Sequence, residues 1–127
     1  MWVNIEDLRI IHAYLFGTVK FLDLLAVLMV VDILTGVLKA IKEKRLRSRN
    51  ALYGYARKVG VFFIIILANI IDVILALNGA VAFVTVLFYI ANEGLSIVEN
   101  LAKIGVKVPT VITDKLHVIS EEKNKEK

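Results

Sequence analysis

The chain contains no cysteine, only one proline and only two histidines in 127 residues. Without cysteine, disulfides and thiolate metal sites are excluded, and cysteine usage gives no indication of the redox compartment. His12 and His117 stand far apart in the sequence, so we expect neither a metal site nor a cofactor. No combination of nucleophile, base and orienting residue is visible outside the apolar stretches, so we do not expect an enzyme.

Charge is also scarce in the middle of the chain. Between Lys58 and Glu93 the only charged side chain is that of Asp72. With 58% hydrophobic residues and a mean hydropathy of +0.74, the chain is more apolar than an ordinary soluble domain. A soluble helical bundle of 14.2 kDa could not hide this much apolar surface. We therefore interpret the chain as an integral membrane protein.

Three apolar stretches are long enough to cross a bilayer, for which about 20 apolar residues are needed. Each stretch carries an acidic residue inside it. The stretches and their acids are 21–41 with Asp32, 59–77 with Asp72 and 80–98 with Glu93. A carboxylate inside a membrane span is costly, which favours a functional interpretation. The third stretch is also interrupted by Asn92 and Ser96, so we expect its insertion to depend on partners or water.

The distribution of basic residues predicts the orientation, because short loops rich in Lys and Arg stay in the cytoplasm. Residues 39–58 contain eight bases and one acid, and six more lysines follow Glu99. Asn78-Gly79 is a strong turn pair that would join the second and third stretches outside, which also places the N-terminus outside. We interpret the net charge of +4 as this topology signal and expect contact with anionic lipid rather than nucleic acid. The bases interpreted as setting the topology are Lys42, Lys44, Arg45, Arg47, Arg49, Arg57 and Lys58.

The two ends of the chain also have helical patterns. Residues 4–20 place apolar side chains at helical spacing, which predicts an amphipathic helix on the outer surface, with a fourth span as the alternative. Gly105 and Pro109 should end the third span, and the pattern from Val111 to Ile119 predicts a short cytoplasmic surface helix before a solvated tail at 121–127.

The predicted fold is an all-α integral membrane protein with three transmembrane helices and an N-terminal amphipathic helix, with the N-terminus outside and the C-terminus inside. Its parts are an amphipathic segment at 1–20, a three-helix transmembrane domain at 21–104 and a basic cytoplasmic tail at 105–127.

Polar and small residues share faces of the three stretches, which predicts a wetted wall or contacts between copies of the chain. The candidates for these roles are Asp32, Thr35, Gly36, Lys39, Asn69, Asp72, Tyr89, Asn92, Glu93, Ser96, Glu99 and Asn100. Distances along the helices place the three acids at different depths, as in a wall rather than a single ring.

Simpler roles for several of these residues stay open. Thr35, Gly36 and Ser96 suit close helix contacts. Asp32 can pair with Lys39 or with bases at the helix ends, Asn69 can donate a hydrogen bond between helices, and Glu93 can be protonated and inert.

Four segments carry a resemblance to a known family. Residues 32–40 (DILTGVLKA), 57–60 (RKVG), 88–100 (FYIANEGLSIVEN) and 105–109 (GVKVP) resemble the phage-lysis and toxin-secretion holin family. The similarity runs from about residue 22 to residue 109, and its specific part is the unusually polar block at 88–100. It implies a protein of the host bacterial cytoplasmic membrane that oligomerises and opens a large hole for an endolysin or toxin.

Two other functional classes remain. A small proton-coupled exporter would use Glu93 as a shared proton and substrate site, and it predicts substrate-dependent proton flux. A small ion channel or a membrane scaffold would pass ions or nothing. Under the holin hypothesis, copies first bury their polar faces against one another in dense rafts, and the helices then rotate those faces towards a growing lumen.

Overall fold

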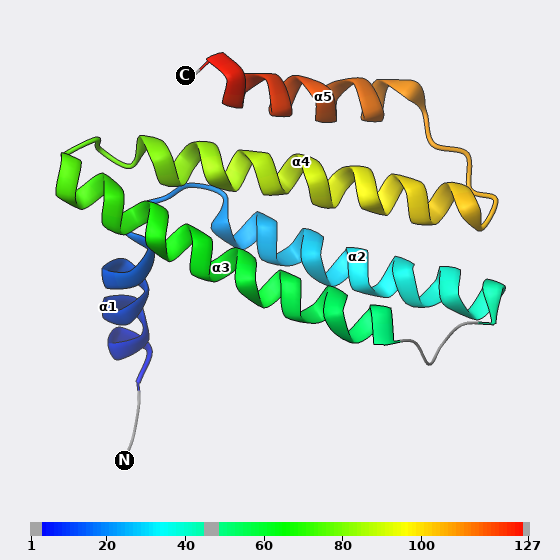
Figure 1. Ribbon diagram of the computed structural model, residues 1–127, viewed down its shortest axis with the longest axis horizontal. Helices are drawn as coiled ribbons and strands as arrows, with labels where there is room; N and C mark the ends of the chain where they lie inside the picture. Colours follow the sequence, from blue (N-terminus) through cyan, green and yellow to red (C-terminus); the bar gives the residue numbers. More distant parts are fainter. Residues whose placement is uncertain (1–3, 45–48, 126–127) are drawn as a thin grey trace.

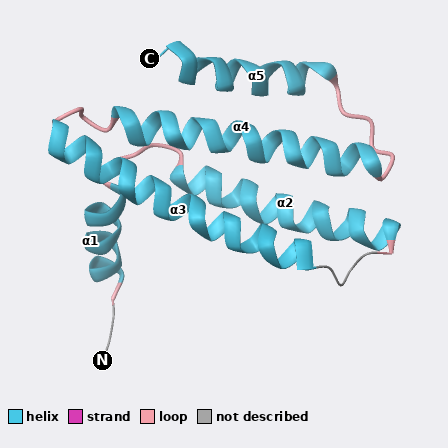
Figure 2. Ribbon diagram, in the orientation of Figure 1, coloured by secondary structure: helices cyan, strands magenta, loops and turns pink. Residues whose placement is uncertain are grey.

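The computed structural model describes residues 4–44 and 49–125, and every regular element within these ranges is an α-helix. The helices are α1 (Ile5–Phe16), α2 (Leu22–Glu43), α3 (Arg49–Leu75), α4 (Ala80–Lys103) and α5 (Thr110–Lys125) (Figures 1 and 2). The predicted all-α class is confirmed.

Three of these helices are long and apolar enough to cross a membrane, namely α2, the part of α3 at Tyr53–Leu75, and α4. They correspond to the three apolar stretches of the sequence. Figure 1 shows them side by side, with α2 and α4 running in one direction and α3 in the other. Helix α1 has only 12 residues and is therefore about 18 Å long, too short to cross roughly 30 Å of hydrocarbon.

Helix α4 holds the bundle together because it contacts α2, α3 and α5. The buried apolar core lies between α2, α3 and α4, and its fully buried side chains are those of Leu25, Ile65 and Val86. Continuing along the same buried faces towards the α2–α3 loop, the side chains become polar. The core therefore occupies only part of the length of the bundle.

The turns follow the sequence signals. Asn78 and Gly79 both have positive φ, 56° and 84°, and together form the turn between α3 and α4. Helix α4 ends at Lys103, and Gly105, with φ of 93°, lets the Val106 amide donate to the Leu101 carbonyl at 3.0 Å. The predicted end of the third span is confirmed.

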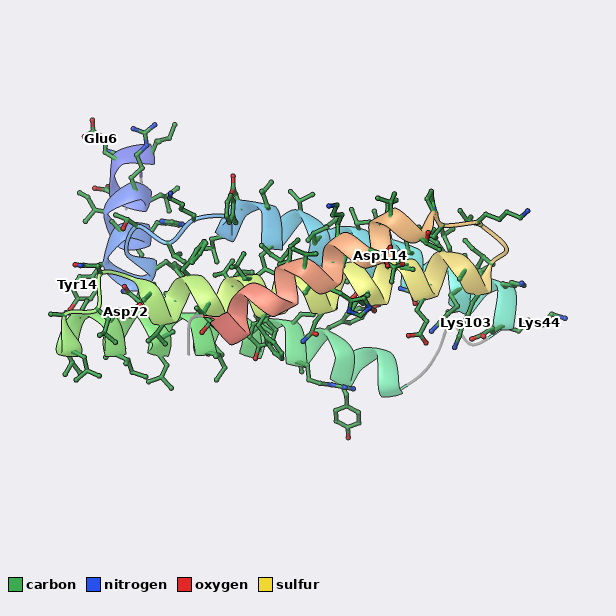
Figure 3. The ribbon with its side chains drawn as sticks, turned by 90° about the horizontal axis from the view of Figure 1, so that it is seen from above. Glu6, Tyr14, Lys44, Asp72, Lys103 and Asp114 are labelled. Atoms are coloured by element: carbon green, nitrogen blue, oxygen red, sulfur yellow. The ribbon has the colours of Figure 1, made fainter. Side chains whose placement is uncertain are left out.

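Helix α5 differs from its prediction in two ways. It continues to Lys125, so the expected solvated tail is helical over most of its length. It also runs back along α4 (Figures 1 and 3), where Leu116 lies over Gly94. A Cβ atom on Gly94 would lie 2.5 Å from the Leu116 Cδ2 atom, so the contact depends on the missing side chain. The sequence pattern of α5 alone does not indicate that Gly94 leaves space for Leu116 on α4.

Candidate functional site

A group of polar side chains continues the buried face of each span beyond the apolar core. On α2, Leu25 and Met29 are followed on the same face by Asp32 and Thr35, all buried. On α4, buried Val86 and Ile90 are likewise followed by Glu93 and Asn100. On α3, Ile65 and Val61 are preceded by Lys58 at the same helical spacing. Three faces therefore change from apolar to polar at one level of the bundle.

Lys58 lies between two carboxylates from different helices. Its Nζ atom is 2.7 Å from Asp32 Oδ2, and it is 3.0 and 3.1 Å from the two carboxylate oxygens of Glu93. The side chains of Lys58, Asp32 and Glu93 are 20%, 8% and 10% exposed. Two acids thus share one base in a largely buried site. Removing one partner of a buried ion pair strongly destabilises the folded protein, because the other charge is left unpaired.

Neutral side chains complete the hydrogen bonds of Asp32. Ser96 Oγ donates to Asp32 Oδ1 at 2.8 Å, and Asn100 Nδ2 donates to the same atom at 2.9 Å. Asn100 also donates to Thr35 Oγ1 at 3.0 Å, and Thr35 donates to the Asp32 carbonyl at 3.1 Å. Within the described residues no buried side-chain nitrogen or oxygen lacks a hydrogen-bond partner. We call Asp32, Thr35, Lys58, Glu93, Ser96 and Asn100 the polar network.

The network corrects the expected depths of the acids. Asp32 and Glu93 meet at one base, so the prediction that all three acids lie at different depths is wrong for this pair. That prediction used distances along each helix, which do not fix the offset between helices. In Figure 1, α4 begins further to the left along the bundle than α2, and this offset helps to bring Glu93 level with Asp32, where one Nζ atom reaches both carboxylates. Of the two pairings that the sequence left open for Asp32, the structure has the one with a base at a helix end, Lys58, and not the one with Lys39.

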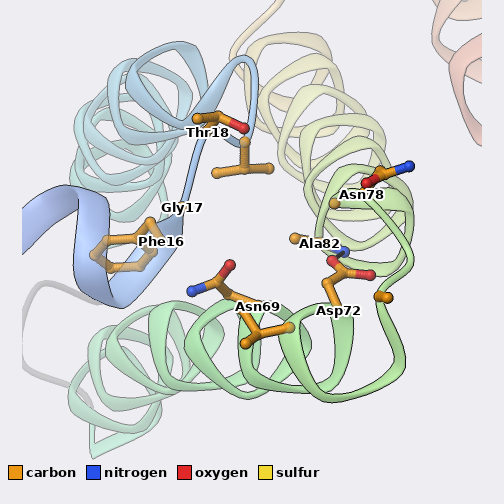
Figure 4. A pocket seen from close by; sticks show the side chains of 11 residues that line it. Phe16, Gly17, Thr18, Asn69, Asp72, Asn78 and Ala82 are labelled. Carbon is orange, nitrogen blue, oxygen red and sulfur yellow. Dashed lines mark hydrogen bonds between the residues drawn. The ribbon is translucent and has the colours of Figure 1, made fainter.

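A second polar group lies at the opposite end of α3. The Asp72 carboxylate accepts hydrogen bonds from the Val81 and Ala82 amides, both at 2.9 Å, and so caps the start of α4. Asn69 Nδ2 donates to the Leu15 carbonyl at 3.0 Å and to that of Tyr14 at 3.3 Å, which ties the end of α1 to α3. Figure 4 shows both side chains pointing into a pocket beside the α1–α2 connection.

Gly17 makes the contact with Asn69 possible. Its φ is +65°, and a Cβ atom there would lie 2.5 Å from Asn69 Oδ1. A side chain at this position would therefore displace Asn69 and strain the backbone. Asn69 thus donates between helices, which was one of the roles left open by the sequence.

The remaining candidates do not join the network as hydrogen-bonding partners. Gly36 lies beside Asn100, and Lys39 lines an open pocket next to the network. Tyr89 is partly buried against the core. Asn92 and Glu99 are exposed on another side of α4, because neighbouring helical positions differ by about 100°. The polar stripe predicted for α4 is therefore split between an inner and an outer face.

Lys58 was predicted only as a topology signal, and the structure also places it in the network as its central base. The sequence does hold a signal for this role, since Lys58, Val61, Ile65, Asn69 and Asp72 recur at helical spacing. Within the part of the chain that the structure describes, no group of three or more side chains is arranged to hold a metal ion.

Those other predicted topology bases that the structure describes lie near the same end of the bundle as Lys58. Lys42 donates to the Lys103 carbonyl at 2.6 Å, and Arg57 donates to the Tyr53 carbonyl at 3.4 Å. Figure 3 shows Lys44 and Lys103 at the end opposite Glu6 and Tyr14. Arg49 is the first residue of α3, and Arg45 and Arg47 lie outside the described residues.

Comparison with known proteins identifies relatives over nearly the whole chain. Residues 10–121 match the bacteriophage holin family. A probable holin of Bacillus phage phi105 is 63% identical over 122 residues, covering 96% of this chain and 90% of the relative. The uncharacterized protein YqxH of Bacillus subtilis strain 168 is 60% identical over 127 residues, covering 100% and 91%. An uncharacterized 14.9 kDa protein of Clostridium perfringens is 35% identical over 123 residues, covering 94% and 92%. No solved structure matches.

Proposed function

The chain belongs to the bacteriophage holin family and is a multi-pass protein of the bacterial inner membrane, and from this premise we propose how it opens holes. Copies of the chain accumulate in the membrane, oligomerise and open a hole wide enough for a folded endolysin or toxin. The polar network holds each copy closed beforehand. The observation that carries this proposal is a base shared by two acids inside a bundle of membrane-spanning helices.

The closed state hides its charges within one copy. Asp32, Lys58 and Glu93 satisfy one another, so α2, α3 and α4 of a single copy can lie in lipid without exposing the two paired carboxylates to hydrocarbon. The network holds two carboxyl groups against one base, and water would stabilise the state in which both acids are ionised. Water and the network therefore compete for the same groups, and a wetted lumen favours separation of α2, α3 and α4.

We place the N-terminus outside and the C-terminus in the cytoplasm. The bases of the α2–α3 loop support this orientation through their number. Helix α1 crosses the end of the bundle at a wide angle (Figure 1), and Ile5, Leu8 and Ile11 are 70%, 57% and 52% exposed. An amphipathic helix lying in the outer interface would bury these side chains among lipid headgroups and acyl chains.

The partners in this account are further copies of the chain, membrane lipids and the protein that passes through the hole. The residues act by pairing and hydration, and no catalytic step is assigned to them, in keeping with a family of non-enzymatic membrane proteins.

Release of a folded reporter tests the proposal. The chain is induced in a bacterium that carries a cytoplasmic fluorescent protein, and a dye for ion permeability is followed in parallel. We expect a delay followed by abrupt release of the fluorescent protein. Dye entry or proton flux while the reporter stays inside would instead favour a channel or an exporter. In the same cells, a Tyr14→Cys variant should react before release with a maleimide that cannot cross the membrane, and failure to react would contradict the proposed orientation.

A further inference from the structure

Asn92 is a polar side chain at an exposed position in the middle of a membrane-spanning helix. Helix α4 covers Ala80–Lys103, which places Asn92 halfway along it. Its side chain is exposed, and it makes no hydrogen bond among the described residues. At this depth lipid offers neither a donor nor an acceptor, so an unpaired carboxamide is unfavourable.

The side of α4 that carries Asn92 is distinct from its two packed sides. Glu93 and Asn100 face α2 and α3, and Gly94 faces α5. Val81, Thr85, Asn92 and Glu99 recur along the remaining side at helical spacing, and we call these four residues the outer line. Among the described residues, no hydrogen bond or ion pair joins the exposed Asn92 side chain to α2, α3 or α5.

Away from the helix ends, the other exposed faces of the described spans are apolar. On α3, Phe63, Val73 and Ile74 are 65%, 72% and 72% exposed, as expected for side chains that face lipid. Among the described spans, only the outer line has an exposed carboxamide near the middle of the membrane. This contrast points to a protein neighbour rather than to lipid.

We propose that the outer line of α4 is the surface on which a second copy of this chain docks, with the two Asn92 side chains hydrogen-bonded to each other. A carboxamide both donates and accepts, so an identical side chain is its natural complement. Towards the α4 C-terminus, Glu99 and Lys103 form an exposed ion pair at 3.4 Å, so each copy also brings an acid and a base to that end. This inference rests on the proposed function, because it names the partner that builds the hole.

The inference also separates tasks on α4. The inner face closes one copy through the polar network, whereas the outer line joins copies. Self-association along the outer line therefore leaves the bonds of Lys58 intact, and closed copies can assemble before any hole opens.

Cysteine cross-linking tests the surface in the intact membrane, since the chain has no cysteine of its own. Val81→Cys places a thiol on the outer line near one end of α4 without altering Asn92. Val73→Cys is the matched control, a valine substituted near the same end on the lipid-facing side of α3. We expect cross-linked dimers from Val81→Cys and few from Val73→Cys. Adding Asn92→Leu should weaken the dimer about threefold to tenfold, and Asn92→Gln should restore most of it.

The outcomes separate this inference from the proposed function. Equal cross-linking of the two cysteine variants, or dimers that Asn92→Leu leaves unchanged, would overturn the docking surface even if the fluorescent reporter is released. Asn92-dependent dimers without reporter release would support the surface and contradict the large hole. Asn92→Leu makes an outward-facing position of the span more apolar, so insertion of the helix should not suffer.

Discussion

At the residue scale, each acid inside the spans has a definite local task. The Asp32 carboxylate accepts hydrogen bonds from Lys58, Ser96 and Asn100, and Glu93 shares Lys58 with it. Asp72 has a different task, because its carboxylate caps the first turn of α4 while Gly79 offers no side chain. Acids in apolar stretches predict that each has a role. Only their contacts show that Asp32 and Glu93 form buried ion pairs whereas Asp72 caps a helix.

Removing the cap should loosen the start of α4. Asp72→Ala leaves the Val81 and Ala82 amides without their acceptors, and loss of such a cap costs about 0.5–2 kcal/mol. We expect faster hydrogen exchange at these two amides in detergent-solubilised protein, and a smaller effect for Asp72→Asn, which keeps one acceptor oxygen. Unchanged exchange in Asp72→Ala would show that the carboxylate does not support this turn.

At the element scale, α5 is the helix whose position conflicts most with a lipid environment. It lies along α4, yet Asp114, Lys115 and His117 are exposed on it. Beside a membrane-spanning α4, these side chains would face hydrocarbon at a high cost. The docked position of α5 therefore suits a state in which this side of α4 borders water while the polar network is still intact, such as a copy at the edge of a forming hole.

A pair of cysteines can report when α5 docks. Gly94→Cys with Leu116→Cys should cross-link poorly in intact cells before reporter release and efficiently afterwards, because water then reaches this side of α4. Gly94→Cys with Leu116→Ala and Val118→Cys is the control, since it also removes the leucine that would clash at position 94, while Val118 points away from position 116 on the same helix. Equal cross-linking of the Gly94–Leu116 pair before and after release would contradict a water-dependent position of α5.

The elements themselves were largely predictable. The three spans, the Asn78-Gly79 turn and the end of α4 at Lys103 follow from apolar length and turn residues, which are local properties. The contact of α5 with Gly94 was not predictable, because it depends on two residues far apart in the sequence. Gly94 leaves space on α4, and Leu116 of α5 fills it. Periodicity likewise gives the face of Lys58 on α3 but not its offset from Asp32 and Glu93.

At the scale of the whole molecule, α4 combines three surfaces with different occupants. One faces the polar network, one carries α5 and one bears Asn92. In our account these surfaces correspond to closure, to the water-lined state and to assembly. The central claim is that the network holds each copy closed until water replaces it.

Timing of release in variants of the central base tests that claim most directly. Lys58→Met leaves Asp32 and Glu93 buried without a cation, and breaking a buried pair in this way costs about 3–5 kcal/mol. Lys39→Met is the control, because it removes a nearby base of the same size from outside the network. Glu93→Gln keeps the Asp32–Lys58 pair and removes the second carboxyl group.

The measurement is the time from induction to release of the fluorescent reporter, at equal amounts of protein in the membrane. We predict early release for Lys58→Met, delayed release for Glu93→Gln and unchanged timing for Lys39→Met. If Lys58→Met does not accumulate, the delay in Glu93→Gln decides the question alone. Timing that is the same in Glu93→Gln, Lys39→Met and the unsubstituted chain would contradict the claim that the polar network holds the closed state.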